Sequence, residues 1–419
     1  MKNFIKSIKA RQILDSRGNP TLEVTVVTDK DVTGVAAVPS GASVGKFEAL
    51  ELRDDNSVYF HGKSVLKAVQ NVNQCINRFL NGMSVFEQFA VDKLMIDEDG
   101  SENKSNLGAN AVLGVSLAVA RAAANTLQIP LFNYIGGINA HVLPVPMINI
   151  LNGGVHADNG LDFQEFMIVP VGFSNFSDAI RCSYEVFNSL KKLLHNDGFM
   201  TSVGDEGGFA PDIEKNEQAL EYLIQAIDLA GYDTDSVKIA LDAASSEFYE
   251  NGYYHMNSKS EILNSNQMVE YLITLSNEFP IISIEDGMAQ DDYKGWAELT
   301  EKIGSKIMLV GDDLMVTNYK KIETCINENI ANSVLIKPNQ TGTLSETFMA
   351  VEMAKTHGYK TIISHRSGET ADTFIADLAV GLNSGFIKTG SLSRSERVEK
   401  YNRLMFIENL LGENAVYFF

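Results

Sequence analysis

The stretch Ser333-Val-Leu-Ile-Lys-Pro-Asn-Gln340 carries the pattern that decides the fold. Three apolar residues, Val334 to Ile336, are followed directly by Lys337. Short apolar runs with β-branched residues are typical of strands buried in a parallel sheet. Burial at the mouth of such a strand would disfavour the charged form of the lysine and lower its pKa, which a lysine requires to act as a base. On its own, the simpler interpretation is a strand-end lysine that reaches into solvent.

Similar apolar runs recur after residue 140, and helical patterns separate most of them. Two helices are expected at Ser177–Asn196 and Glu214–Ala230, each with a glycine shortly after its end. This alternation predicts a parallel sheet, and about eight strands predict a closed (β/α) barrel, with an open doubly wound sheet as the alternative. The predicted strands are Val145–Leu151, Phe163–Val171, Val237–Leu241, Ile281–Ile284, Ile307–Val310, Val334–Ile336, Thr361–Ser364 and Phe386–Ile387.

Residues 1–136 predict a smaller α+β domain at the N-terminal side of the barrel. A glycine-rich linker at Gly136–Ala140 leads from it into the barrel domain, residues 141–419. The expected strands of the smaller domain are Phe4–Ala10, Thr21–Thr28 and Val32–Val38, of which the last two would form a hairpin.

The smaller domain also contains helical patterns. The apolar spacing predicts a helix over Gly62–Gly82, and Ser84 with Glu87 predicts a capping box at the start of the next helix. A nearly all-apolar helix is expected at about Leu107–Leu127. Its apolar part, Ala111–Ala120, is far shorter than the ~20 residues needed to span a bilayer, so it predicts a buried helix and no membrane span.

The chain has 34 basic and 54 acidic residues, which gives a formal net charge of −20. This balance argues against general binding to nucleic acid or anionic membranes, because both need a basic surface. An anionic substrate would need a local positive site. The cysteines, Cys75, Cys182 and Cys325, have neither zinc-site spacing nor an even number, and residues 1–11 contain no secretory signal. Both features predict a cytoplasmic protein.

Carboxylates follow three successive predicted strands. The first strand ends in Asp242, the second in Glu285 and Asp286, and the third in Asp312 and Asp313. The active site of a parallel barrel lies at the carboxyl ends of its strands, so these groups would meet there. A single strand-end aspartate is more often a helix cap or turn residue, but a cluster of carboxylate oxygens suits Mg²⁺. The pattern therefore predicts a magnesium site.

Basic or ionisable side chains follow the next three strands. They are Lys337, then His365 with Arg366, and then Lys388. In so acidic a chain, four such groups gathered at the carboxyl ends of the strands predict a site for a phosphate or a carboxylate. Arg366 could bind two oxygens of such a group at once.

Two glycine-containing loops add weaker candidates. Gly204-Asp-Glu-Gly-Gly208 places Glu206 between glycines, which would allow the backbone to approach a ligand closely. Asn152-Gly-Gly-Val-His156 precedes the pair Gln164 and Glu165. Each loop alone fits an ordinary turn or a structural histidine, so neither identifies a site by itself.

The loop Gly41-Ala-Ser-Val-Gly45 matches the nucleophile elbow of serine hydrolases. It follows a predicted hairpin rather than a strand-to-helix turn, and no partner acid or histidine has a matching context. The match to a phosphate-binding P-loop is one residue short. A small loop of this kind could instead close over a site in the other domain.

Together these motifs resemble the enolase family from end to end. The resemblance implies a smaller α+β domain followed by a modified (β/α)8 barrel whose early units depart from the regular order. It also implies a hydro-lyase of glycolysis and gluconeogenesis that reversibly removes water from 2-phospho-D-glycerate to give phosphoenolpyruvate. The matching motifs are Asp15–Thr21, Ser40–Gly45, His61–Lys63, Leu107–Ala111, Gln164–Ile168, Gly204–Gly208, Ser283–Asp286, Ser364–Thr370, Lys388–Gly390 and Arg394–Arg397.

The resemblance assigns roles to residues of this chain. Lys337 would be the base and Glu206 the acid, with His156 and Glu165 as further catalytic residues. Two Mg²⁺ per active site are implied. The implied ligands of the first are Asp242, Glu285 and Asp312, and Ser43 would contact the second. The implied substrate-binding residues are Ser43, Gln164, Arg366, Ser367, Lys388 and His365.

The resemblance further implies a homo-oligomer, either a dimer or a multiple of dimers such as an octamer, with Arg17 and Glu23 near the interface. A cytoplasmic protein with an additional secreted or cell-surface pool is the implied localisation. Val44, Thr341 and Asn106 depart from residues common in the family without removing a functional group. Two alternatives stay open. They are a different dehydratase of the same superfamily and a surface-binding role without catalysis.

Overall fold

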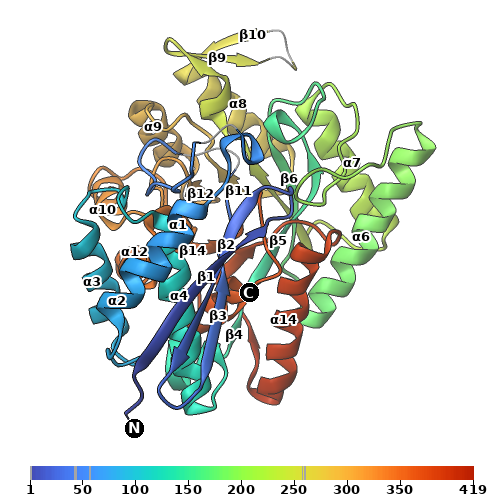
Figure 1. The fold of residues 1–419 in the computed structure, drawn as a ribbon. Coiled ribbons are helices and arrows are strands. Elements are labelled where there is room, and N and C mark those ends of the chain that lie inside the picture. The colour runs from blue at the N-terminus through green and yellow to red at the C-terminus, as the bar shows by residue number, and fades with distance from the viewer. Residues whose placement is uncertain (1, 42–44, 56–57, 257, 259–260) are drawn as a thin grey trace.

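The N-terminal domain is built on a three-stranded antiparallel sheet (Figure 1). The computed structural model describes residues 2–41, 45–55, 58–256, 258 and 261–419. In the sheet, β1 (Ile5–Leu14) pairs with β2 (Pro20–Thr28), which pairs with β3 (Thr33–Ala37). The alternate apolar residues of β2 are fully buried, as expected for a strand with one face in the core. The predicted strands of this domain are therefore confirmed.

The helix α4 (Ala109–Leu127) packs against this sheet, and almost all of its residues are buried. The prediction of a buried apolar helix is confirmed. Helix and sheet are so close at Gly34 that a Cβ there would lie 2.2 Å from the backbone oxygen of Ala118. Among the described residues, no single helix has the length and apolar character to cross a membrane. Ala109–Leu127 and Leu131–Asn139, bent by 96°, meet that test of length and composition only as a pair.

The remaining N-terminal helices are α1 (Leu66–Gln70), a π-helical stretch (Asn71–Ile76), α2 (Asn77–Leu80), α3 (Gln88–Asp99) and α5 (Leu131–Gly136). The predicted capping box is wrong, because α3 has no side-chain cap at its start. Ser84 forms a β-bridge with Phe4, and this pairing holds the segment extended. Its hydroxyl accepts a hydrogen bond from the backbone N–H of Phe86, and the helix begins only at Gln88.

Eight strands of the C-terminal domain close into a barrel, which confirms the predicted barrel and all eight predicted strands. Small shifts at the strand ends are the main difference from the prediction. Around the barrel the strands are β5 (Val145–Asn152), β6 (Glu165–Pro170), β7 (Val237–Asp242), β11 (Ile281–Glu285), β12 (Met308–Gly311), β13 (Ser333–Ile336), β14 (Lys360–Ser364) and β15 (Gly385–Lys388).

The parallel sheet expected from the strand pattern does not include β6, which runs antiparallel to both β5 and β7. This strand is a departure from the regular order among the early units of the barrel, as the family resemblance implied. A loop with one short 3₁₀ turn, and no crossover helix, joins β5 to β6. Antiparallel neighbours can be joined in this way, whereas parallel neighbours need a longer crossover. As a result, the first residue of β6, Glu165, lies beside Asp242, the last residue of β7.

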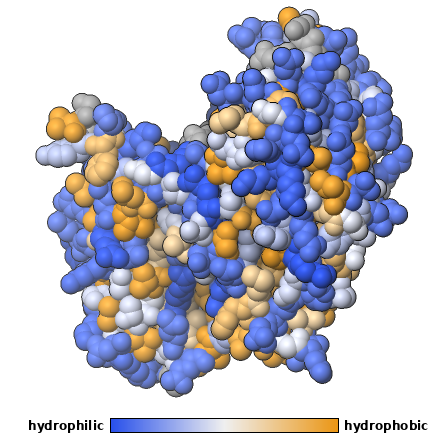
Figure 2. All heavy atoms as spheres, turned by 90° about the vertical axis from the view of Figure 1, so that its right-hand side faces the viewer, coloured by the Kyte–Doolittle hydropathy of each residue, from blue (hydrophilic) through white to orange (hydrophobic). Residues whose placement is uncertain are grey.

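Helices cover the outside of the barrel (Figure 1). They are α6 (Phe176–Asn196), α7 (Asn216–Leu229), α8 (Ser265–Glu278), α9 (Tyr293–Ile303), α10 (Tyr319–Asn327), α12 (Leu344–Thr356), α13 (Phe374–Gly381) and α14 (Ser395–Leu411), with the short α11 (Pro338–Thr341) after β13. Figure 2 shows that the face over α6 and α7 is mostly hydrophilic, with apolar side chains in small groups, which is an ordinary domain surface.

Two small sheets complete the C-terminal domain. The strands β8 (Tyr249–Glu250), β9 (Tyr253–Met256) and β10 (Glu261–Asn264) form an antiparallel sheet between β7 and α8 in the chain. Near the C-terminus, β16 (Val416–Tyr417) pairs in parallel with β4 (Val142–Leu143), just before the first barrel strand.

Candidate active site

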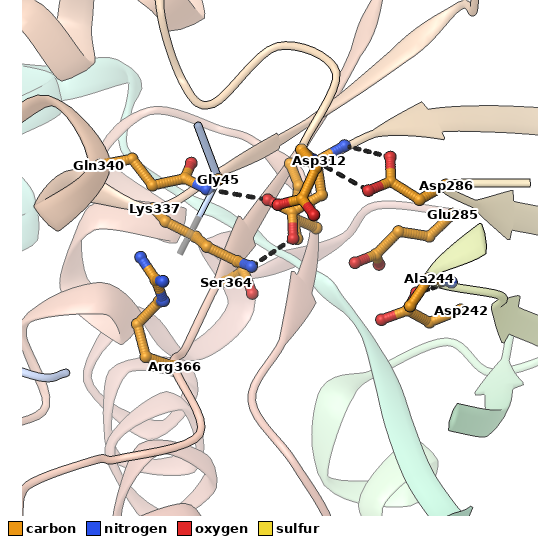
Figure 3. A network of polar contacts seen from close by, with 12 residues as sticks. Gly45, Asp242, Ala244, Glu285, Asp286, Asp312, Lys337, Gln340, Ser364 and Arg366 are labelled. Carbon is orange, nitrogen blue, oxygen red and sulfur yellow. Dashed lines mark hydrogen bonds and ion pairs between the residues drawn. The ribbon is translucent and has the colours of Figure 1, made fainter. Parts of the chain in front are cut away.

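Three buried carboxylates lie at the ends of neighbouring barrel strands. Asp242 is the last residue of β7, Glu285 is the last residue of β11, and Asp312 directly follows β12. Each is less than a tenth exposed. Figure 3 shows the Asp242, Glu285 and Asp312 side chains in one group with Lys337. The barrel therefore brings together the three acids that the sequence pattern predicts.

The ammonium group of Lys388, the last residue of β15, lies among these acids. Its Nζ donates to Asp242 Oδ2 at 2.9 Å and to both carboxylate oxygens of Glu285 at 2.9 Å. It also forms an ion pair with Glu165 at 3.3 Å. Burial opposes the charged form of Lys388, but the surrounding carboxylates outweigh burial and raise its pKa well above the usual range.

The carboxylate set fits a hard divalent cation. Burial, together with the charge of Asp242, raises the pKa of Glu285 well above its ordinary value, so negative charge is concentrated here. All the donor atoms are carboxylate oxygens, which favour Mg²⁺ or a similar ion. In the described chain, two groups bring their ligand atoms within 4.8 Å of one another: His156, Glu165 and Glu206, and Asp286, Asp312 and Asp313. The predicted set of Asp242, Glu285 and Asp312 is not one of these groups, and here the Lys388 ammonium contacts both Asp242 and Glu285.

Asp286 stabilises the turn after β12 by hydrogen bonds to its backbone. Its own φ is 41°, and its carboxylate accepts hydrogen bonds from the backbone N–H groups of Asp312 and Asp313, each at 2.9 Å. Burial and the neighbouring acids raise the pKa of Asp313 to about 7. Although Asp286 also follows a predicted strand, the sequence pattern gave no sign that it fixes the backbone at Asp312.

Lys337 lies at the end of β13, and its ammonium group pairs with the Asp312 carboxylate. Burial disfavours the charged lysine, as predicted. However, the Asp312 charge, supported by Glu285, outweighs burial, and the pKa of Lys337 is raised. The expectation of a lowered pKa is therefore wrong, because the Asp312 carboxylate lies directly against the ammonium group.

Arg366 and Ser367 follow β14 and line the same cavity as Lys337. The Arg366 guanidinium forms an ion pair with Glu48 of the N-terminal domain at 2.9 Å and donates to Asn339 Oδ1 at 3.1 Å. Sequence reasoning missed Glu48. It stands three residues after Gly45 in a motif of the N-terminal domain, and no strand end marks it.

Glu165 and Glu206 form a buried carboxylate pair with opposite shifts in pKa. Burial and the Glu206 charge raise the pKa of Glu165 well above its usual range. Burial acts in the same direction on Glu206, but His365 and His156 outweigh it and hold the Glu206 pKa well below its usual range. Environments that separate two carboxyl pKa values in this way are typical of acid–base sites. Of the two, Glu165 is the one whose protonated form the surroundings favour.

Arg397 sets the tautomer of His365. A guanidinium can only donate hydrogen bonds, and Arg397 contacts His365 Nδ1, so Nδ1 accepts and Nε2 carries the proton. His365 Nε2 lies 3.5 Å from Glu206 Oε2. Arg397 also donates to the backbone oxygens of Arg366 and Ser367, each at 2.6 Å. This fully buried arginine was matched in the sequence only as part of the Arg394–Arg397 motif.

Two family models match nearly the whole chain. The model described as "Enolase, N-terminal domain" matches residues 5–135, and "Enolase, C-terminal TIM barrel domain" matches residues 140–418. The chain belongs to the enolase family. Membership in the enolase family supports a function of the enolase superfamily, that of a metal-dependent lyase, and the acidic groups described above could hold the metal.

Most of the residues predicted for this enolase-family site surround one cavity. The predicted residues that line it are His156, Gln164, Glu165, Glu206, Asp242, Asp312, Lys337, His365, Arg366, Ser367 and Lys388. Glu285 is connected to these cavity-lining residues by its ion pair with Lys388. Gln164 Nε2 donates to Asp242 at 3.3 Å. Ser43 and the neighbouring Val44 lie outside the described residues, so their predicted roles stay predictions.

Proposed function

We propose that this enolase-family chain catalyses the reversible dehydration of 2-phospho-D-glycerate to phosphoenolpyruvate and water. The observation that carries the proposal is a single buried cavity that contains a lysine, a carboxyl pair and an arginine. The reaction needs a base for the proton on carbon 2, an acid for the hydroxyl on carbon 3 and positive charge around the substrate. The cavity offers a candidate for each.

Lys337 is the proposed base for the proton on carbon 2. Its side chain is 14% exposed at the end of β13, and Asp312 fixes its ammonium group at the cavity wall. The proton on carbon 2 is very weakly acidic, so the base must be held close to it and the developing negative charge must be stabilised.

The carboxyl pair is the proposed acid. Glu165, whose pKa is raised, would pass a proton to Glu206, whose pKa is lowered, and Glu206 would then give that proton to the hydroxyl that leaves carbon 3. His156 lies about as far from both, with Nδ1 3.9 Å from Glu165 and 4.0 Å from Glu206. Gln164 and His156 would orient the leaving group.

Arg366 and Ser367, with neighbouring His365, would bind the phosphate, and Lys388 would pair with the substrate carboxylate. A guanidinium matches phosphate geometry through two parallel hydrogen bonds, and the Lys388 ammonium is already held at the cavity wall. The enzyme of this proposal is therefore specific for a phosphorylated hydroxy acid.

Asp242, Glu285 and Asp312 would hold one Mg²⁺, and a second would be contacted by Ser43. When bound, a divalent cation supplies positive charge that stabilises the negative charge developing on the substrate carboxylate. Magnesium that binds the folded chain should also raise its melting temperature. We expect this rise in the unvaried protein and a smaller one in Glu285→Gln, which can be measured without substrate.

The test of the reaction is the formation of phosphoenolpyruvate from 2-phospho-D-glycerate, followed by ultraviolet absorbance with Mg²⁺ and with a chelator. Chelation should abolish turnover, and renewed Mg²⁺ should restore it. Lys337→Ala and Glu206→Gln should each lower kcat by at least about a thousandfold, within the range known for acid and base residues. The control is Lys360→Ala, at the start of β14 and far along the strand from the site.

Turnover close to that of the unvaried protein in Lys337→Ala or Glu206→Gln would contradict the assigned roles. Equal activity on the unphosphorylated acid would contradict the proposed phosphate site. It would favour a different dehydratase of the superfamily.

We also propose that the chain forms a homodimer or a multiple of dimers and acts in glycolysis in the cytoplasm, with an additional secreted or cell-surface pool. The three cysteines are free, as expected in a reducing compartment. Light scattering of the purified protein tests the assembly, and a monomer at micromolar concentration would contradict it. Cell fractionation tests both locations.

A further inference from the structure

Glu48 belongs to the N-terminal domain and lines the cavity of the candidate active site. The other residues described around the cavity, from His156 to Lys388, belong to the barrel domain. The Glu48 side chain is 5% exposed and the Arg366 side chain 4% exposed, so their ion pair is buried. Glu48 Oε2 accepts from Arg366 at 2.9 Å, and Oε1 accepts from the second terminal nitrogen at 3.3 Å. A two-point contact of this kind fixes the plane of a guanidinium.

The same carboxylate has two further donors. Glu48 Oε1 accepts from the backbone N–H of Gly45 at 3.0 Å and from Gln340 Nε2 at 3.3 Å. Gln340 Nε2 also donates to Asp312 Oδ1 at 3.0 Å. The Glu48 carboxylate thus contacts both Arg366, the proposed phosphate-binding residue, and Gln340. Gln340 in turn contacts Asp312, a proposed metal ligand, and Figure 3 labels Gln340, Asp312 and Arg366.

Neighbouring contacts hold Glu48 itself in place against the barrel. The backbone N–H of Ala49 donates to the backbone oxygen of Gln340 at 2.9 Å. The ring of Phe47 lies under Lys321 of α10, with Nζ 3.5 Å from the ring centroid. Because both neighbouring residues contact the barrel domain, one through its backbone and one through its ring, the position of the carboxylate does not depend on Arg366 alone.

We propose that Glu48 is a positioning residue that holds the Arg366 guanidinium in the orientation required to bind the substrate phosphate. This inference rests on the proposed function and deepens it. Without the carboxylate, the guanidinium would lose the charged two-point contact that fixes its plane, which a neutral hydrogen bond such as that to Asn339 Oδ1 does not replace. A side chain with many rotamers would then lose more freedom when phosphate binds, and affinity would fall.

The test compares Glu48→Gln with the matched control Glu346→Gln. Glutamine keeps the size of the side chain but removes the charge that pairs with Arg366. Glu346 forms another ion pair between the domains, with Lys104 at 3.0 Å, and lies away from the cavity. In Glu48→Gln, we expect KM for 2-phospho-D-glycerate and the dissociation constant of inorganic phosphate each to rise about tenfold, the equivalent of about 1.4 kcal/mol. The kcat should change much less than KM, and the control should match the unvaried protein.

Unchanged phosphate affinity in Glu48→Gln would overturn the proposal. Tighter phosphate binding would also overturn it, because Glu48 would then compete with phosphate for Arg366. In an Arg366→Gln background, Glu48→Gln should add no further loss, and full additivity of the two effects would contradict a role through Arg366. Calorimetry with inorganic phosphate needs no turnover. It therefore still tests Glu48 if the unvaried protein fails to dehydrate 2-phospho-D-glycerate, a result that would defeat the proposed function alone.

Discussion

The environment of His365 keeps this residue neutral. The side chain is buried, and burial lowers its pKa to about 4, with Arg397 acting in the same direction and Glu206 opposing. A neutral imidazole with its proton on Nε2 can donate to Glu206 without adding a charge to the cavity. At neutral pH, His365 therefore faces Glu206 as a neutral hydrogen-bond donor.

The lowered pKa predicts a loss of stability in acid. The unfolded chain protonates His365 below about pH 6.5, whereas the folded protein resists protonation until about pH 4. Unfolding therefore binds a proton between these values, so stability falls as pH falls, by on the order of 3 kcal/mol in total. The melting temperature should decline less steeply from pH 7 to 4.5 in His365→Gln than in the unvaried protein. Equally steep declines would show that other groups control acid stability.

Lys337 illustrates what a sequence pattern can predict about one residue. The apolar run before it predicted its burial at a strand end, because that property is local. The sign of its pKa shift depends on Asp312, which lies 25 residues earlier on another strand. Only the closed barrel brings the two together. A cation bound to Asp312 would weaken this attraction and favour the neutral lysine.

Close packing of β3 on α4 depends on a residue without a side chain. At Gly34, a Cβ would lie 2.2 Å from the Ala118 oxygen and 2.3 Å from the Ala122 nitrogen, and both atoms belong to the helix backbone. Backbone atoms cannot rotate away as a side chain could. The sheet and α4 would have to separate to accept a methyl group.

Gly34→Ala should therefore lower the free energy of unfolding by about 3 kcal/mol, at the upper end of the usual range for overpacking. Val35→Ala is the control, because it alters the next residue of β3, whose side chain is 37% exposed. Thermal unfolding of both variants measures the difference. A melting temperature for Gly34→Ala as high as that of Val35→Ala would contradict the close packing.

Helices and strands were predicted well where the apolar periodicity is strong. They were predicted poorly where the direction of a strand, or the start of a helix, depends on contacts with another segment. The eight barrel strands and α4 follow from local patterns. The direction of β6 does not, because Phe163–Val171 has the same apolar character in either orientation. Ser84 and Glu87 have the spacing of a helix cap, but Ser84 forms a β-bridge with Phe4 and does not cap a helix. Both errors concern contacts with segments distant in sequence.

A buried ion pair connects the two domains. Arg121 of α4 donates to both carboxylate oxygens of Asp372, each at 2.6 Å. Asp372 also accepts from the backbone N–H groups of Ala37 at 2.8 Å and Phe374 at 2.7 Å. One carboxylate therefore serves donors from α4, from β3 and from the barrel domain. Together with Glu48, it fixes the N-terminal domain over the barrel.

Removal of this carboxylate should destabilise the whole molecule. Asp372→Ala leaves Arg121 without its carboxylate partner, and breaking one side of a buried pair typically costs about 3–5 kcal/mol, so about 3 kcal/mol is expected here, because the Arg121 side chain is 21% exposed. We expect a clear fall in melting temperature and faster cleavage by a protease. The control Asp97→Ala removes a surface ion pair within α3, with Lys93, and should change little. Similar melting temperatures for the two variants would contradict the role of Asp372.

The pairing of β15 with β5 has a consequence for the order in which this chain acquires structure during its synthesis. The ring of strands closes only when Phe386 lies beside Val145, and β16 later pairs beside β4. On the ribosome, the three-stranded sheet and α4 can assemble from the first third of the chain. The barrel must wait for residues 385–388, so its earlier strands remain exposed at their edges for most of translation. Nascent chains of this protein should therefore depend on chaperone protection until synthesis has reached the last tenth of the chain.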